Sequence, residues 1–301
     1  MVQIPDQHIP KRRWHRWRVA GSAIGLLLLI AAIGLIFTRS QELSGVWSAL
    51  AKPHPAALAL LLVISILLVP LTAVVQNSLL QYTSGVRVSL VEMSSLITLS
   101  TLLNMLPLWP GAIGRIGYHH KIHGIHPTRS AMAIIAARLI GLPIALTALL
   151  MVWIFGDLHL SQLAAAWIVV SVLLLLGSLV ARWRCAMLAA AAIWISFGLE
   201  AIRYRAAFAL LGVPLGASAM TAITGGSTVA TSIPFLGGGP GAREWAVGWM
   251  TTQYEHLPSA LEVGLLADLL VRVATLAVML PCAVLAYRIL SRQIQRGRRQ
   301  S

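Results

Sequence analysis

The sequence is poor in charged residues and almost free of cysteine. Charged residues make up 11% of its 301 residues, whereas a typical soluble domain has roughly 25%. Among them, 9 Asp and Glu are outnumbered by 23 Lys and Arg, which gives a formal charge of +14. The two cysteines, Cys185 and Cys282, each lie in or near an apolar run. Neither a disulfide framework nor a cysteine-based metal site is therefore expected.

The motifs of common enzyme classes are missing as well. The chain has no Gly-x-Ser-x-Gly, no Walker lysine motif and no His-Glu-x-x-His. It also has no hydrophilic segment longer than a tail or a short loop, which leaves no room for a nucleotide-binding or transferase domain. We therefore expect no enzyme activity, no cofactor, no metal and no ATP-driven pumping by this chain alone.

Four histidines close together invite a metal site, since His119 and His123 are four residues apart and would share one face of a helix. No acidic residue accompanies them in a metal-binding pattern, and Lys121 lies between them. We expect a solvated basic edge that faces lipid headgroups, formed by His119, His120, His123 and His126.

Apolar residues dominate the chain and make up 58% of it. Several runs have the ~20-residue length that crosses the hydrocarbon core of a bilayer, the clearest being Val19–Phe37, Ala56–Val75 and Leu163–Ala181. The first run is long for the core of a signal peptide, and no small-x-small cleavage pattern follows it. The sequence therefore predicts an all-α polytopic membrane protein with a retained first span.

The basic residues gather at the two ends of the chain and beside the apolar runs. This distribution is typical of cytoplasmic segments of membrane proteins, so we expect no binding of nucleic acid. Both ends should be cytoplasmic, in a cell inner membrane, which requires an even number of crossings. We expect six full spans, near residues 19, 56, 130, 163, 186 and 258.

Two similar segments, about 130 residues apart, interrupt the apolar sequence with a proline followed by a Pro-Gly-Ala step. Regular helix does not continue through such segments, because proline lacks the backbone N–H and glycine adds conformational entropy. In lipid, a broken backbone persists only where protein or a water-filled cavity surrounds it. We therefore expect re-entrant hairpins at 89–123 and 217–253, formed by Pro107, Pro110, Gly111, Pro234, Gly239, Pro240 and Gly241.

Three crossings separate the two hairpins, so they should enter from opposite faces as an inverted repeat, an arrangement found in secondary transporters. The expected architecture is a single membrane domain over residues 1–301. It has a basic tail (1–18), a first half (19–154), a second half (160–290) and a second basic tail (291–301). The alternative is eight plain spans in which the prolines only kink the helices.

Charged residues in the middle of apolar runs are costly and are therefore usually paired or functional. Arg138 and Arg272 each lie in the span that follows a hairpin, 28 residues after the first Pro-Gly step and 32 after the second. Asp268 precedes Arg272 by four residues and Glu200 precedes Arg203 by three, so each pair can form an ion pair on one helix face.

Three further charges, Arg115, Arg243 and Glu244, follow the two breaks directly. A helix that begins there would point unsatisfied N–H groups toward an anion, and arginine suits bidentate phosphate binding. We expect a positively biased cavity whose headgroup ligands are Asn104, Arg115, Arg138, Arg243 and Arg272. The expected countercharges or proton carriers are Glu200, Glu244 and Asp268. The alternative is that these charges form structural ion pairs between helices.

The two breaks and their flanks also carry a family resemblance. It rests on Asn104-x2-Pro107-x2-Pro110-Gly111-x2-Gly114, Ala137-Arg138-Leu139, Ile233-Pro234-x5-Pro240-Gly241-x2-Glu244 and Arg272. On these motifs the chain resembles the flippase-like membrane family named after the transmembrane region of lysylphosphatidylglycerol synthase, which includes hopanoid-associated membrane proteins. Arg115 and Tyr118 stand where that family usually has a glutamate and an arginine. The resemblance implies movement of lipid between leaflets without lipid synthesis.

We therefore expect a protein that moves an anionic or aminoacylated phospholipid, or a lipid-linked amphiphile, between leaflets, with membrane lipids as its partners. One alternative is a membrane scaffold or partner subunit for a lipid-modifying or glycosyltransferase enzyme. Another is an intramembrane enzyme with Glu200 or Glu244 as base. A third is the DedA-like class of membrane proteins, which also pairs re-entrant hairpins, although its chains are shorter and differently spaced.

Overall fold

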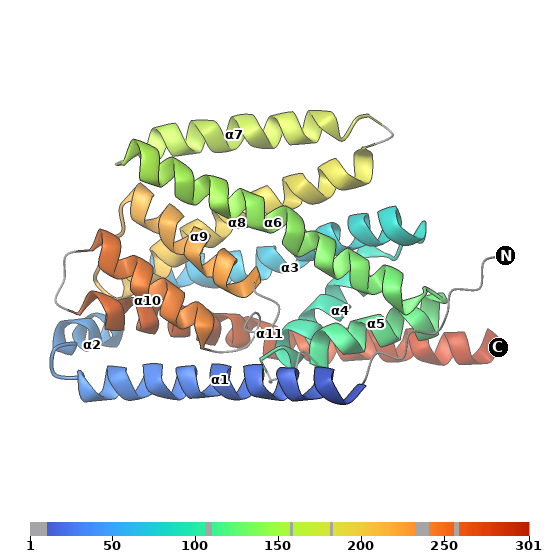
Figure 1. Ribbon diagram of the computed structural model, residues 1–301, viewed down its shortest axis with the longest axis horizontal. Coiled ribbons are helices and arrows are strands. Elements are labelled where there is room, and N and C mark those ends of the chain that lie inside the picture. Colours follow the sequence, from blue (N-terminus) through green and yellow to red (C-terminus); the bar gives the residue numbers. More distant parts are fainter. Residues whose placement is uncertain are drawn as a thin grey trace.

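The protein is a bundle of α-helices, seen in a computed structural model that describes residues 11–105, 110–156, 159–180, 183–232, 241–255 and 259–300 (Figure 1). No strand occurs within these ranges. The helices are α1 (Lys11–Thr38), α2 (Ser44–Ala51), α3 (Pro55–Ser84), α4 (Leu90–Leu103), α5 (Pro110–His123), α6 (Pro127–Phe155), α7 (Leu160–Gly177), α8 (Arg184–Leu210), α9 (Ala217–Ser232), α10 (Ala242–Tyr254) and α11 (Ala260–Gln300).

Four helices are long and apolar enough to cross a membrane: α3, α6, α8 and the Ala260–Gln295 part of α11. Large apolar side chains such as Trp153 on α6 (81% exposed) and Leu285 on α11 (61% exposed) point away from the bundle. In a soluble protein such an apolar surface would be a liability, whereas lipid covers it without cost. The four helices therefore indicate a membrane protein.

The other two expected crossings correspond to α1, which has 28 residues, and α7, which has 18. Among the residues whose side chains the structure describes, their apolar segments are Ile24–Thr38 and Ser161–Gly177. Both helices run alongside the bundle at opposite margins (Figure 1). The expected basic tails are partly helical, since α1 begins at Lys11 and α11 continues to Gln300. Residues 11–18 and 291–300 are therefore helical.

Glycine and proline mark the ends of the long helices. Pro55 and Pro127 begin α3 and α6, in the first turn where the missing N–H of proline costs nothing. The chain leaves α3 at Gly85 and α6 at Gly156, both with positive φ, which glycine adopts without a Cβ clash. These local signals explain why the boundaries lie where they do.

Four shorter helices flank the two Pro-Gly breaks. They are α4 and α5 with 14 residues each, α9 with 16 and α10 with 13, so each is only about 20–24 Å long at ~1.5 Å per residue. Figure 1 shows α4 and α5 in the half of the molecule where α11 ends, and α9 and α10 in the other half. The breaks themselves, with Pro107, Pro234, Gly239 and Pro240, lie outside the described residues.

The contacts between helices form two matching sets. In the centre, α3 packs along α8. Around this pair, α4 packs on α11 and α9 packs on α6, while α3 contacts α6 and α8 contacts α11. If α3, α4, α5 and α6 are exchanged for α8, α9, α10 and α11, the α3–α8 contact is unchanged and each of the other contacts becomes its counterpart.

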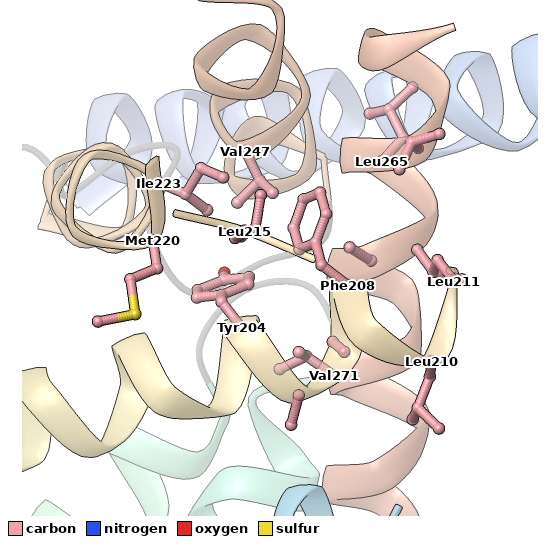
Figure 2. Packing of buried hydrophobic residues seen from close by; sticks show 14 of the residues in the cluster. Tyr204, Phe208, Leu210, Leu211, Leu215, Met220, Ile223, Val247, Leu265 and Val271 are labelled. Carbon is pink, nitrogen blue, oxygen red and sulfur yellow. The ribbon is translucent and has the colours of Figure 1, made fainter. Parts of the chain in front are cut away.

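The larger apolar core lies where α8, α9, α10 and α11 meet. Figure 2 shows Tyr204 and Phe208 of α8 facing Ile223 of α9 and Val247 of α10, with Val271 of α11 close by. All five side chains are fully buried. Since lipid is as apolar as these side chains, close packing rather than exclusion of water holds such a core together in a bilayer.

At both breaks a glycine allows the beginning of one helix to pack directly against the backbone of another helix. A Cβ on Gly111 would lie 2.1 Å from the carbonyl oxygen of Ser100 in α4. Gly241 has φ +116°, and a Cβ there would lie 2.3 Å from the carbonyl oxygen of Gly25 in α1. Only glycine fits in either position.

Replacing Gly111 with alanine should therefore destabilise the protein. The new methyl group must push α5 away from α4, a cost of about 1–3 kcal/mol for overpacking. We expect a lower melting temperature of the detergent-purified protein. The matched control is Gly114→Ala on the same helix, where a Cβ meets nothing within 4 Å. Equal stability of the two variants would contradict the close approach.

Candidate functional site

A cavity of about 310 Å³ lies between the first half of the bundle, α3–α6, and the second half, α8–α11. Four arginines from four helices line it: Arg138 of α6, Arg203 of α8, Arg243 of α10 and Arg272 of α11. Its other polar lining residues are Ser65, Thr72, Thr101, Asn104, Thr231 and Thr275. The rest of the wall is apolar, contributed by Leu68, Val69, Ile97, Met105 and Met279.

Two fully buried carboxylates stand behind the arginines. Asp268 of α11 and Glu244 of α10 both have 0% exposure. The Nε of Arg243 donates to Oδ1 of Asp268 at 2.8 Å, and the Nε of Arg272 lies 2.7 Å from Oε1 of Glu244 and 3.5 Å from Oδ2 of Asp268. Charges this deep in a protein persist only when paired, so the four groups depend on one another.

Tyr204 ties α8 to this network. Its hydroxyl donates to Oδ1 of Asp268 at 2.6 Å and lies 3.1 Å from the hydroxyl of Ser227 on α9. The guanidinium carbon of Arg243 lies 5.9 Å from the centre of the Tyr204 ring, within the range of a cation–π contact. Three helices are therefore joined through one carboxylate.

A second ion pair lies one turn earlier on α8. Arg203 donates to Glu200 through Nη2 and to the hydroxyl of Thr275 through Nη1, the latter at 3.3 Å. Arg243 approaches the same carboxylate at 3.8 Å. Glu200 thus connects Arg203 with Arg243 on the wall of the cavity.

Positive charge exceeds negative charge around the cavity. Four arginines line it, whereas three carboxylates, Glu200, Glu244 and Asp268, form the ion pairs described above. Among the described residues, no carboxylate lies within ion-pairing distance of Arg138, whose Nη1 donates to the carbonyl of Thr231 at 3.1 Å. The side chain of Arg138 is exposed and contributes to the cavity wall. One uncompensated arginine therefore faces the cavity.

Three lining residues each have a buried polar atom without a hydrogen-bond partner within the described ranges. The atoms are Oδ1 of Asn104, at the end of α4, Nε of Arg203 and Nη2 of Arg243. Buried polar groups are normally satisfied by protein or water. All three residues line the cavity, so water or a polar ligand there would satisfy these atoms.

The structure brings most of the predicted site residues together. Asn104, Arg138, Arg243 and Arg272 line the cavity, and Glu200, Glu244 and Asp268 pair with its arginines. Arg115 of α5 does not belong to this wall; it is buried with 8% exposure and its Nε has no hydrogen-bond partner among the described residues. The sequence interpretation missed Arg203 as a cavity residue, although its spacing from Glu200 marked it as charged and paired.

The expected anion site at the start of α10 also needs a correction. The backbone N–H of Gly241 donates to Oε2 of Glu244 at 2.7 Å. A carboxylate three residues into a helix often caps its N-terminus in this way. The protein's own acid therefore occupies the place that an anionic ligand would take.

A second polar cluster lies where α4 begins and α5 ends. Glu92 of α4, with 6% exposure, accepts hydrogen bonds from Tyr118 and from Nε2 of His123, each at 2.8 Å. His119 is buried, with 3% exposure, and its Nδ1 lies 2.8 Å from the hydroxyl of Ser130 on α6. The expectation that all four histidines form a solvated edge is therefore wrong for His119, whereas His120 and His126 are exposed.

Acid should destabilise this cluster in two steps. Burial, and then the charge of nearby Arg115, lower the pKa of His119 from 6.5 to about 4. Burial alone would raise the pKa of Glu92, but the hydrogen bonds from His123 and Tyr118 outweigh it and lower that pKa below 4.5. In both cases the unfolded chain takes up the proton at a higher pH than the folded protein does, so stability falls as the pH falls.

We expect the melting temperature to decrease between pH 6.5 and about 4 through His119, and further below pH 4.5 through Glu92. The variant His119→Gln should flatten the first decrease and leave the second. His54→Gln, at an exposed histidine before α3, is the matched control and should change neither. A first decrease that persists unchanged in His119→Gln would contradict the assignment.

The network around Asp268 yields a separate prediction. Asp268→Asn keeps the size of the side chain but leaves Arg243 and Arg272 short of a negative charge, which costs about 3–5 kcal/mol for a broken buried pair. We expect a large loss of stability in denaturant titrations of the purified protein. Glu42→Gln breaks the exposed pair with Arg39 and should have little effect. A comparably small effect of both changes would show that the buried network contributes little.

Comparisons of the chain with protein-family models, with curated proteins and with solved structures give no match. The family resemblance of the two Pro-Gly segments therefore stays a prediction.

Proposed function

We propose that the protein moves a lipid with an anionic headgroup, or a lipid-linked amphiphile, between the two leaflets of a membrane. The observation that carries this proposal is the central cavity lined by four arginines and backed by three carboxylates. A positive excess at the centre of an apolar bundle is costly unless an anion uses it. The four apolar helices of crossing length support a position of this cavity within a membrane.

The chemistry of the lining favours a phosphate-like group. The planar guanidinium of arginine donates two parallel hydrogen bonds to phosphate or carboxylate oxygens. Arg138 has no carboxylate within ion-pairing distance among the described residues and is exposed at the cavity wall. It is therefore the first contact for an incoming headgroup, while the ion-paired arginines are already held in place around it.

The size of the cavity suits a headgroup and not a whole lipid. A volume of about 310 Å³ is at the lower end of the range for small-molecule sites, roughly 300–1,000 Å³. The acyl chains of a bound lipid would have to remain outside it, among apolar helices. This division is the one a lipid-moving protein needs, because only the headgroup is costly to carry through the hydrocarbon core.

The arrangement of helices supports an inverted repeat with two re-entrant hairpins. The helices that flank each break are too short to cross a bilayer separately. The two hairpins occupy opposite halves of the bundle, and the packing contacts match when α3–α6 is exchanged for α8–α11 (Figure 1). The beginning of α1 and the end of α11 lie at the same end of the molecule, in agreement with six crossings and two cytoplasmic ends in an inner membrane.

The carboxylates have a role in this proposal that needs no covalent chemistry. Glu200, Glu244 and Asp268 hold three arginines in fixed positions and compete with a bound anion for them. This competition keeps the headgroup from binding too tightly to be released. A proton taken up by one of these acids would strengthen headgroup binding, and its loss would favour release.

The proposal predicts that Arg138→Gln slows lipid movement without unfolding the protein. Arg138 pairs with no acid among the described residues, so its replacement leaves no buried carboxylate without an ion-pair partner. Losing a charge-assisted hydrogen bond of about 1.5–3 kcal/mol slows movement about tenfold or more. The measurement follows headgroup-labelled phosphatidylglycerol across the membrane of proteoliposomes. The double variant Arg138→Ala, Arg272→Ala should be slower still.

The matched control is Arg39→Gln, at an exposed arginine outside the cavity, which should leave the rate unchanged. Wild-type-like movement in Arg138→Gln and in the double variant would overturn the proposed role of the cavity. A wild-type protein that moves no lipid, and instead co-purifies with a lipid- or glycan-modifying enzyme, would favour the scaffold function.

A further inference from the structure

A groove of about 320 Å³ lies between α4 and α11, separate from the arginine cavity. No charged residue lines it. Its lining consists of Leu90, Val91, Ser94, Ser95 and Thr98 from α4, and of Cys282, Leu285, Ala286 and Ile289 from α11. The mostly apolar wall of this α4–α11 groove fits a hydrocarbon chain better than a polar ligand.

The hydroxyl groups in the groove do not change this character. Ser95 donates to the carbonyl of Val91 at 2.8 Å, and Thr98 donates to the carbonyl of Ser94 at 2.9 Å. Two of the three hydroxyls in the groove are thus satisfied within their own helix, as is common for serine and threonine in membrane helices, and they require no polar partner there. The third hydroxyl belongs to Ser94.

The groove continues the arginine cavity along the same two helices. On α11, Thr275 and Met279 line the cavity, and Cys282 and Ala286 line the groove. These residues are three or four apart and therefore form one stripe on one helix face. On α4 the same spacing of three or four residues runs back along the chain from Thr101 of the cavity to Thr98, Ser94 and Val91 of the groove.

The corresponding contact between α6 and α9 is tightly packed instead. A Cβ on Gly225 of α9 would lie 2.8 Å from Cγ of Leu149 and 3.3 Å from the carbonyl oxygen of Ala145, both on α6. Near the cavity, Arg138 bridges the same two helices through its hydrogen bond to the carbonyl of Thr231. The α6–α9 contact is thus closed at Gly225, whereas the α4–α11 contact holds a groove. It lies in the half of the molecule where α11 ends (Figure 1).

We propose that the α4–α11 groove binds an acyl chain of the lipid whose anionic headgroup occupies the arginine cavity. The stripe from the cavity to the groove changes from charged to apolar, which is the polarity of an anionic lipid from headgroup to chain. Because the groove leads to the cavity, lipid from the leaflet nearest the end of α11 would enter through the α4–α11 contact. This inference rests on the proposed function and specifies its substrate as a lipid with a hydrocarbon chain.

Cys282 provides a natural probe, because it is exposed and lines the groove. In the full-length variant Cys185→Ser it is the only thiol, so a bimane label can be attached to it. The labelled protein is reconstituted in phosphatidylcholine vesicles that contain a minor fraction of phosphatidylglycerol with brominated acyl chains, which quench bimane on contact. The control carries the label at Val284→Cys, with Cys282→Ser, on the exposed face of α11 outside the groove.

We expect stronger quenching at Cys282 than at the control position, because bound phosphatidylglycerol places its chain in the groove. Arg138→Gln should remove this excess, since the headgroup then no longer anchors the chain. Brominated phosphatidylcholine in the same fraction should quench both positions alike. Equal quenching at the two positions with phosphatidylglycerol, or an excess that persists in Arg138→Gln, would overturn the inference.

A second experiment separates the groove from the proposed function itself. Ser94→Trp fills the groove and should slow movement of labelled phosphatidylglycerol about tenfold, equivalent to roughly 1.4 kcal/mol. Val284→Trp, the same change on the exposed face of α11, should leave the rate unchanged. If the wild type moves lipid and Ser94→Trp does so equally fast, the groove inference fails and the proposed function stands. If the wild type moves no lipid, the proposed function fails.

Discussion

The carboxylate of Asp268 is the group on which the centre of this protein depends. It has no exposed surface and receives Arg243 of α10, Arg272 of its own helix and the hydroxyl of Tyr204 on α8. Burying an ion costs several kcal/mol unless partners surround it. The three helices must therefore meet in one register, and the beginning of α10, directly after the second break, is placed by that requirement.

The same ion pairs fix the wall of the cavity. They hold Arg203, Arg243 and Arg272 in position, so an anion that bound there would cost little side-chain entropy. The fourth arginine, Arg138, comes from α6 in the other half of the bundle. The cavity is therefore complete only when both halves are assembled around it.

The two halves pack alike but carry different chemistry. Their helix contacts match pair by pair, yet the buried acids Glu244 and Asp268 both belong to the second half. The first half instead buries Glu92 on α4 and Arg115 and His119 on α5. The packing follows the same physical rules in both halves. The second half contributes most of the charges around the arginine cavity, whereas the first half forms a polar cluster where α4 begins and α5 ends.

Composition and run lengths by themselves determined that the chain is helical and membrane-embedded, and proline and glycine marked where helices begin and end. Spacing also paired Glu200 with Arg203 and Asp268 with Arg272, because residues three or four apart share a helix face. Only the tertiary structure decided that Arg203 lines the cavity, that Arg115 does not, that Glu244 caps its own helix and that His119 is buried. The physical reason is that lipid-facing and protein-facing sides of a membrane helix are equally apolar, so periodicity cannot show which neighbour a helix meets.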